Sequence, residues 1–125
     1  MPRFAISRHE SPRGLHWDLF LEDGDTLRTW ALPQTPQPGA TMICDALPEH
    51  RLAYLDYEGA ISDGRGAVSL WDRGSYAIQQ QSDAELILTL RGQRLAGRVV
   101  LERLAHAPGT WKFFYEPMAT QESSP

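Results

Sequence analysis

The sequence predicts an all-β fold, a small closed or partly open antiparallel β-barrel of about eight or nine short strands. Ten glycines and nine prolines interrupt the chain at short intervals. The runs between them are rich in valine, isoleucine, leucine and aromatic residues, a composition typical of strands. No segment shows the 3.6-residue apolar period of a long amphipathic helix. About nine short strands suit a barrel or a sandwich, and a barrel leaves few exposed edges.

The strands are predicted in order from runs bounded by turn residues. Asp23-Gly24, Asp72-Arg73-Gly74 and Arg91-Gly92 are typical of tight turns and indicate antiparallel hairpins. The proline-rich segment Pro33 to Thr41 is predicted to be a loop. The expected strands are Arg3–His9, Leu15–Glu22, Thr26–Leu32, Leu52–Glu58, Val68–Asp72, Ser75–Gln80, Glu85–Arg91, Arg98–Leu104 and Trp111–Tyr115.

The length of 125 residues fits one domain, which we place at residues 1–118, followed by a disordered polar tail at 119–125. Cys44 is the single cysteine, so an intramolecular disulfide is excluded and a reducing cytoplasm is the expected location. Residues 1–7 lack the apolar core of a signal peptide, and no apolar run has the length of a membrane span. We expect a monomer that makes no membrane contact.

The net charge of −4 argues against a protein that coats nucleic acid, because such binding depends on many Lys and Arg contacts to phosphates. Binding of a single nucleic-acid end stays open. Arg3, Arg8 and Arg13 lie among the first fourteen residues with Glu10 as the only acid. They form either a local basic rim or an ordinary solvated face.

A metal site is the main chemical hypothesis. Strand alternation places His16 and Asp18 side by side on the face opposite Leu15, Trp17, Leu19 and Leu21. His9 can return as a third ligand across the turn at Ser11-Pro12-Arg13-Gly14. Two imidazoles and a carboxylate suit Mn²⁺ or Zn²⁺ with open positions, and also the iron of an oxygenase. The alternative is an ordinary solvated strand face.

His50 and Tyr54 form a second candidate pair, because even spacing on a strand would place both side chains on one face. His50 then acts as a general acid or phosphate ligand, and Tyr54 donates a hydrogen bond to phosphate. A surface histidine and a half-buried tyrosine are the alternative. Asp56 and Glu58 either orient the histidines or cap a turn. The four tryptophans, Trp17, Trp30, Trp71 and Trp111, are predicted to pack in the core rather than to stack on bases.

These residues belong to a longer set of landmarks in a fixed order: Arg8-His9, Leu15-His16-Trp17-Asp18, Leu21-Glu22, Trp30-Ala31-Leu32-Pro33, His50, Leu52, Tyr54, Asp56, Glu58-Gly59, Trp71-Asp72-Arg73-Gly74, the run from Gly92 to Arg98, and Trp111. In this order and spacing the chain resembles the 3′-phosphoesterase module of bacterial end-joining DNA ligase D and its stand-alone relatives. The resemblance extends from Phe4 to about Tyr115.

The resemblance implies a compact β-barrel that binds Mn²⁺, with Zn²⁺ or Co²⁺ as other candidates. Such a protein removes a terminal 3′-ribonucleoside and then a 3′-phosphate from nucleic-acid ends in DNA repair. By position, His9, His16 and Asp18 match the family's metal ligands, while His50 and Tyr54 match its active-site histidine and tyrosine. A DNA ligase or polymerase acting in trans is the implied protein partner.

The chain also departs from the family pattern. Phe20, Gln34 and Met42 stand where the family has an arginine, a lysine and an arginine that would hold phosphate. Arg8, Arg13 and Arg51, together with Arg3, are candidates to replace these cations. The alternative is a non-catalytic barrel that binds a nucleic-acid end or a repair partner.

Overall fold

The computed structural model describes residues 2–118, so the predicted tail at 119–125 lies outside the described residues. Within this range the chain forms strands and one short 3₁₀ helix. The elements are β1 (Arg3–Ser11), β2 (Gly14–Asp23), β3 (Thr26–Leu32), β4 (Thr41–Arg51), η1 (Leu52–Leu55), β5 (Gly59–Ala60), β6 (Ala67–Gln81), β7 (Glu85–Gly92), β8 (Ala96–Arg103) and β9 (Thr110–Pro117). No helix in this range is long and apolar enough to cross a membrane.

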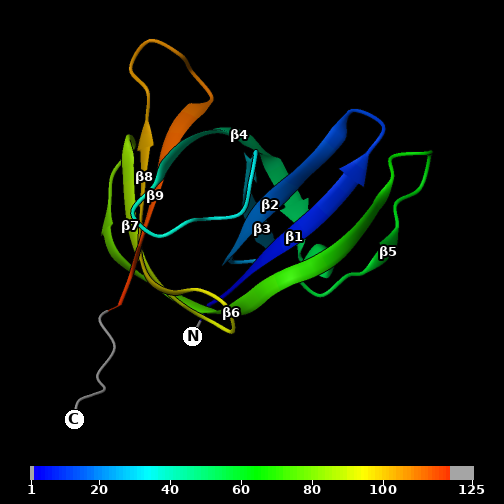
Figure 1. The fold of residues 1–125 in the computed structure, drawn as a ribbon, viewed down its shortest axis with the longest axis horizontal. Helices are drawn as coiled ribbons and strands as arrows, with labels where there is room; N and C mark the ends of the chain where they lie inside the picture. Colours follow the sequence, from blue (N-terminus) through cyan, green and yellow to red (C-terminus); the bar gives the residue numbers. More distant parts are fainter. Residues whose placement is uncertain (1, 119–125) are drawn as a thin grey trace.

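Eight strands form a hydrogen-bonded ring in the order β1-β2-β3-β4-β9-β8-β7-β6, and β6 returns to β1. Every pair of neighbouring strands is antiparallel. The short β5 pairs only with the start of β6 and lies outside the ring. The ring is uneven around its axis, which makes the fold a partly open barrel. The predicted all-β barrel is confirmed (Figure 1).

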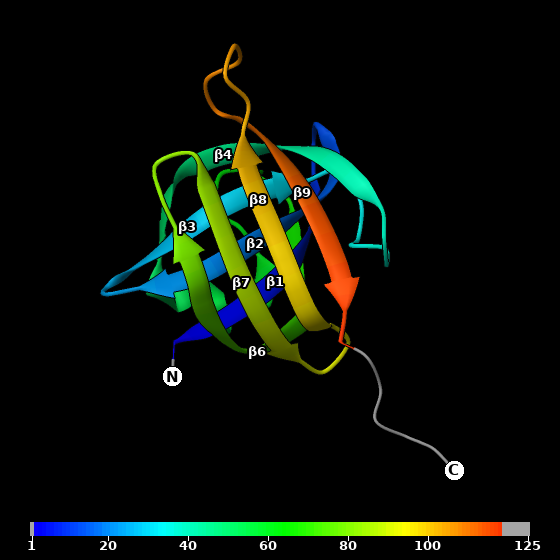
Figure 2. The same ribbon diagram turned by 90° about the vertical axis from the view of Figure 1, so that its left-hand side faces the viewer.

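Two long strands, β4 and β6, connect the two sides of the barrel. The first part of β6 pairs with β1, and its second part pairs with β7. In the same way β4 pairs first with β9 and then with β3. Figure 2 shows the layer of β6 to β9 crossing in front of β1 to β3. Such corners, made by strands that change partners at a bend, are typical of crossed sheet packing.

The predicted hairpin turn at Asp72-Arg73-Gly74 is wrong, because these residues lie inside the continuous strand β6. The Asp72 carboxylate is buried and accepts backbone N–H groups from Arg73 and from the turn between β7 and β8. A Cβ on Gly74 would overlap the backbone of Arg91, so glycine permits close approach of β7. The Asp-x-Gly sequence therefore lies at a bend within β6, where the strand changes partner, and does not reverse the chain.

The predicted strand Leu52–Glu58 is also wrong, since Leu52–Leu55 is η1, and the strands β4 and β5 were not predicted. Leu52 and Leu55 lie three residues apart, so one turn of 3₁₀ helix directs both toward the barrel wall. In β4 the alternation of buried and exposed residues covers only the first few positions. Met42 and Cys44 point inward, but Pro48 and polar residues interrupt the pattern.

The apolar residues form two clusters on opposite faces of the same strands. The larger cluster fills the barrel interior and includes Trp30 and Trp111, whose rings pack edge to face with centroids 5.7 Å apart. Trp17 and Trp71 pack against it, so the predicted packing role of the tryptophans is confirmed. The smaller cluster lies on the outer face and consists of Ala5, Phe20, Leu27 and Leu55. It fixes η1 against the outside of β1, β2 and β3.

Candidate metal centre

The hairpin of β1 and β2 brings together His9, His16 and Asp18 on the outer face of the barrel. His9 lies directly opposite His16, and Ser7 lies opposite Asp18. Alternation places these side chains on the face opposite the interior residues Leu19 and Leu21. The hairpin reverses at the predicted turn, where Ser11 pairs with Gly14. The local sequence therefore accounts for the whole cluster.

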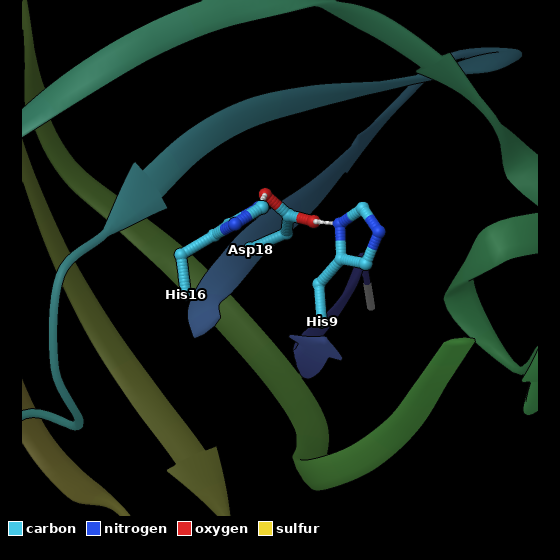
Figure 3. Close-up of side chains that lie close together, drawn as sticks. All are labelled: His9, His16 and Asp18. Carbon is cyan, nitrogen blue, oxygen red and sulfur yellow. Dashed lines mark hydrogen bonds and ion pairs between the residues drawn. The ribbon is translucent and has the colours of Figure 1, made fainter. Parts of the chain in front are cut away.

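The three side chains point toward one another (Figure 3). His16 Nε2 lies 3.0 Å from Asp18 Oδ1, and His9 Nδ1 lies 3.6 Å from Asp18 Oδ2. One ligand atom from each residue lies within 4.8 Å of the other two. The Asp18 side chain is only 5% exposed, whereas the histidines are partly open to solvent. Asp18 thus forms the base of a small cluster with one open side.

The backbone carbonyl of Arg65 determines which nitrogen of His9 faces the cluster. His9 Nε2 lies 2.9 Å from this oxygen, which only accepts hydrogen bonds, so Nε2 carries the proton. In the neutral ring Nδ1 then has a lone pair directed at Asp18, and 3.6 Å is too long for a hydrogen bond. A cation between these two acceptor atoms would satisfy both. Metal-binding histidines commonly donate their other N–H to a backbone carbonyl in this way.

The donor spacing fits a divalent ion. Ligands that bond at about 2.1 Å lie roughly 3.0–3.5 Å apart in octahedral or tetrahedral geometry. The 3.0 Å separation at Asp18 lies in that range, and the 3.6 Å separation lies just above it. The hydrogen bond to Asp18 raises the pKa of His16, with a smaller contribution from the carboxylate charge and against the effect of burial. Without a metal, the His16 Nε2–H therefore donates to Asp18 Oδ1, and a cation bound there would take the place of this proton.

A cleft of about 290 Å³ opens beside His9 and Asp18, and Phe20 forms part of its wall. His50 and Tyr54 line it, but not through the even spacing on one strand that we predicted. His50 lies near the end of β4 and Tyr54 in η1, with ring centroids 5.9 Å apart. His50 also lies against Phe20, at 5.4 Å between centroids. His50 Nδ1 lies 2.9 Å from the Pro48 carbonyl oxygen, so Nδ1 donates and Nε2 remains available.

Two arginines line the cleft, Arg51 from the predicted set and Arg65, which sequence reasoning missed. Neither makes an ion pair within the described residues. Arg8 lies on the opposite face of β1 and pairs with Glu10. Arg13 lies in the exposed turn of the first hairpin and, like Arg8, is not part of the cleft lining.

Arg65 reaches the cleft because the loop at residues 61–66 folds back onto β1. The N–H of Ile61 donates to the Gly66 carbonyl at 2.8 Å and closes the loop. Gly66 has φ 96°, and a Cβ there would overlap the Glu10 backbone. The Arg65 side chain donates to the carbonyl oxygen of Ser62 at 3.0 Å. The glycines flanking Arg65 were the only signal of this arrangement in the sequence.

The other residues singled out from the sequence lie outside the cleft. Met42 is buried in the barrel interior, so the side chain at this position does not face a bound phosphate. Gln34 lies in the exposed loop after β3. Asp56 pairs with Arg3 and Arg73, and Glu58 accepts the backbone N–H of Leu70. The Arg65 carbonyl, rather than either acid, orients His9.

Comparison with known proteins gives one consistent family. The sequence profile described as "DNA Ligase D 3′-phosphoesterase domain" matches residues 7–103. The chain is 33% identical over 106 residues to "Multifunctional non-homologous end joining protein LigD" of Pseudomonas aeruginosa, covering 77% of this chain and 12% of that protein. It is 34% identical over 109 residues to the protein of the same name from Mycobacterium bovis, covering 80% and 14%.

The protein of that name from Mycolicibacterium smegmatis is 31% identical over 115 residues, covering 79% of this chain and 15% of the relative. The matched region is therefore most of this chain but a small part of each relative.

Proposed function

The chain belongs to the DNA ligase D 3′-phosphoesterase domain family, and from this premise we propose that it is a metal-dependent 3′-phosphoesterase. It would trim 3′-ribonucleoside or 3′-phosphate ends of nucleic acid during DNA repair by end joining. The observation that carries the proposal is the cluster of His9, His16 and Asp18 beside a cleft lined by His50, Tyr54 and two arginines without ion-pair partners in the described range.

His9 Nδ1, His16 Nε2 and an Asp18 oxygen are the proposed metal ligands. Mn²⁺ is the proposed ion, and Zn²⁺ and Co²⁺ suit the same nitrogen and oxygen donors. When bound, a divalent ion supplies positive charge that polarises a phosphoryl oxygen. The Arg65 carbonyl holds the His9 ring in the required tautomer. The hairpin register fixes His16 opposite His9, so the ligand set needs little rearrangement on binding.

His50 is the proposed general acid. Its Nδ1–H donates to the Pro48 carbonyl, which fixes the ring and leaves Nε2 free to face the substrate. In the hydrolysis a water oxygen forms the new bond to phosphorus, and as the bond to the sugar oxygen breaks, His50 gives the Nε2 proton to that oxygen. Tyr54 donates a hydrogen bond to a non-bridging phosphate oxygen, and Arg51 and Arg65 balance the phosphate charge from the two sides of the cleft.

The proposed partner is a nucleic-acid 3′ end, DNA or mixed DNA and RNA, bound by a monomer. The relatives named as multifunctional end-joining proteins are much longer than this chain, which spans 12% to 15% of their length. A trimmed 3′-hydroxyl is the substrate that a polymerase extends and a ligase seals. We therefore propose that such an enzyme acts after this chain, in the cytoplasm.

The test is release of nucleoside and phosphate from a primer-template that ends in a 3′-ribonucleotide or a 3′-phosphate. The reaction is run with and without Mn²⁺ for the parent, for His16→Ala and for His106→Ala, an exposed histidine outside the cleft. We expect Mn²⁺-dependent release in the parent and in His106→Ala but not in His16→Ala. If the folded parent binds the ion and releases nothing, the chain is a binding module instead.

A further inference from the structure

The cleft beside His9 and Asp18 is called the metal-side cleft below. A second hollow of about 300 Å³ adjoins it on the outer face of the barrel. The two share three lining residues, Arg51, Tyr54 and Ile61. Tyr57 and Ala60 line only the second hollow. A ligand held beside the metal ligands can therefore extend past Arg51 into this hollow without leaving the protein surface.

A row of aromatic rings connects the two spaces. His50 lies against Tyr54, and Tyr54 against Tyr57, with 5.9 Å between centroids in each pair and the rings close to perpendicular. Tyr57 is the outermost ring and is 38% exposed. It belongs to neither apolar cluster of the fold. Its ring is thus available for a ligand rather than used by the core.

Tyr57 is held in place by its own loop. Its hydroxyl donates to the carbonyl oxygen of Ala60, and its N–H donates to the Tyr54 carbonyl at 3.4 Å. Gly59 lies between with φ 134°, and a Cβ there would come within 3.3 Å of the Tyr57 hydroxyl. The polar end of the side chain is therefore occupied by the backbone. The part that remains for a ligand is the aromatic ring.

The two spaces match the two chemically different parts of a nucleotide, its phosphate and its base. The metal-side cleft offers cations and hydrogen-bond donors, which suit phosphate. Apart from Arg51, the second hollow offers an aromatic ring and uncharged side chains, which suit a nucleobase, because every base has a face that stacks on aromatic side chains. Arg51 lies where the two join. The nucleoside bonded to the phosphate would enter the second hollow.

Resting on the proposed function, we propose that Tyr57 stacks on the base of the nucleoside that adjoins the scissile phosphate. Arg51, at the junction, contacts the phosphate itself. Besides Arg51, which faces the phosphate, and the two tyrosines, the remaining polar side chain in the lining is Ser62, whose hydroxyl both donates and accepts and so does not select one base. The subsite therefore accepts any of the four bases and discriminates against an abasic end.

The experiment compares two oligonucleotides that end in a 3′-phosphate, one with a normal terminal nucleotide and one with a tetrahydrofuran residue that lacks the base. KM and kcat for phosphate release are measured for the parent, Tyr57→Ala, Tyr57→Leu and Tyr57→Phe. Ile78→Ala removes an exposed apolar side chain elsewhere and is the control. Tyr57→Leu retains apolar volume and keeps the test available if the alanine variant does not fold.

Tyr57→Ala and Tyr57→Leu are expected to raise KM for the normal end by about 5- to 100-fold, with kcat changed by less than about twofold. Tyr57→Phe and Ile78→Ala are expected to resemble the parent. All variants are expected to behave alike on the abasic end. If Tyr57→Ala and Tyr57→Leu raise KM equally for both ends, or for neither, the proposed subsite is wrong.

Binding of the same oligonucleotides, followed by fluorescence anisotropy, separates this proposal from the catalytic one. If the parent prefers the normal end through Tyr57 but releases no phosphate, the subsite stands and the phosphoesterase proposal fails. If the parent releases phosphate and Tyr57→Ala matches it on both ends, the enzyme stands and the subsite fails. If the parent shows neither binding of the oligonucleotides nor release of phosphate, both proposals are wrong.

Discussion

Replacing Gly66 by alanine is expected to weaken metal binding without changing any ligand side chain. Gly66 has φ 96°, and a Cβ there would overlap the backbone of Glu10, so the loop at residues 61–66 must move away from β1. Arg65 precedes Gly66, and its carbonyl oxygen accepts a hydrogen bond from His9 Nε2, which lies 2.9 Å away. The shift therefore removes the hydrogen bond that keeps His9 Nδ1 directed at Asp18.

The expected loss follows from similar contacts in metal sites. Removing a hydrogen bond that orients a metal-bound histidine typically lowers metal affinity by about 10- to 100-fold. This corresponds to about 1.4–2.7 kcal/mol of binding free energy. We expect isothermal titration calorimetry with Mn²⁺ to show a loss of this size for Gly66→Ala, with all three ligand residues unchanged.

Two control variants isolate the cause. Gly64, in the same loop, has φ 68°, but a Cβ there meets nothing within 4 Å. Gly64→Ala therefore adds backbone strain of about 1–2 kcal/mol without forcing the loop from β1. Arg65→Ala removes the guanidinium and keeps the carbonyl, so it should raise KM for a 3′-phosphate end at unchanged Mn²⁺ affinity. If Gly66→Ala binds Mn²⁺ as tightly as Gly64→Ala, the carbonyl does not support the site.

Three further outcomes are expected. Asp72→Ala removes four charge-assisted hydrogen bonds at a buried corner and should cost about 4 kcal/mol, seen as a fall of roughly 12–20 °C in melting temperature, and a fall below about 5 °C would contradict this role. His50→Gln should lower kcat by about 10²- to 10⁴-fold in single-turnover assays at unchanged Mn²⁺ affinity, and an unchanged kcat would exclude a general acid there. Burial, with a smaller effect of the Asp45 charge, raises the pKa of Cys44 from 9.0 to about 12. The folded state holds this proton more tightly than the unfolded state, so the stabilisation is complete below pH 9 and is lost as the pH rises toward 12. Iodoacetamide at pH 8 should therefore react with Cys44 only as fast as the protein unfolds, and rapid reaction of the folded protein would refute its burial.

The sequence predicted that His9, His16 and Asp18 come together because this grouping depends on local features. Alternation along β2 and the turn at Ser11 to Gly14 together determine that His9 faces His16 and lies next to Asp18. The corner at Asp72 was missed for the opposite reason. An Asp-x-Gly sequence suits both a hairpin turn and a bend, and the bend is selected by backbone N–H groups 21 to 23 residues away. Local patterns do not contain that information.

Arg65 and η1 show the same limit of local patterns. The contact between His9 and the Arg65 carbonyl joins residues 56 positions apart, and a single arginine between glycines has no periodicity that places it. Leu52 to Leu55 suits a strand or a helical turn equally well. The outer cluster, in which Leu55 packs with Ala5, Phe20 and Leu27, selects the helical turn. The position of Tyr54 in the cleft follows from that packing.

Phe20 makes the inner wall of the cleft apolar, so the positive charge of the site lies elsewhere. At 3% exposed it is part of the outer cluster that holds η1, and its ring lies against His50. An arginine in its place would bring a charge into that apolar contact, at a cost in desolvation. Arg51 and Arg65 instead lie at the exposed edges of the cleft, where a cation keeps most of its hydration. The apolar floor can therefore position His50 and Tyr54, while the charge proposed to hold phosphate comes from Arg51 and Arg65.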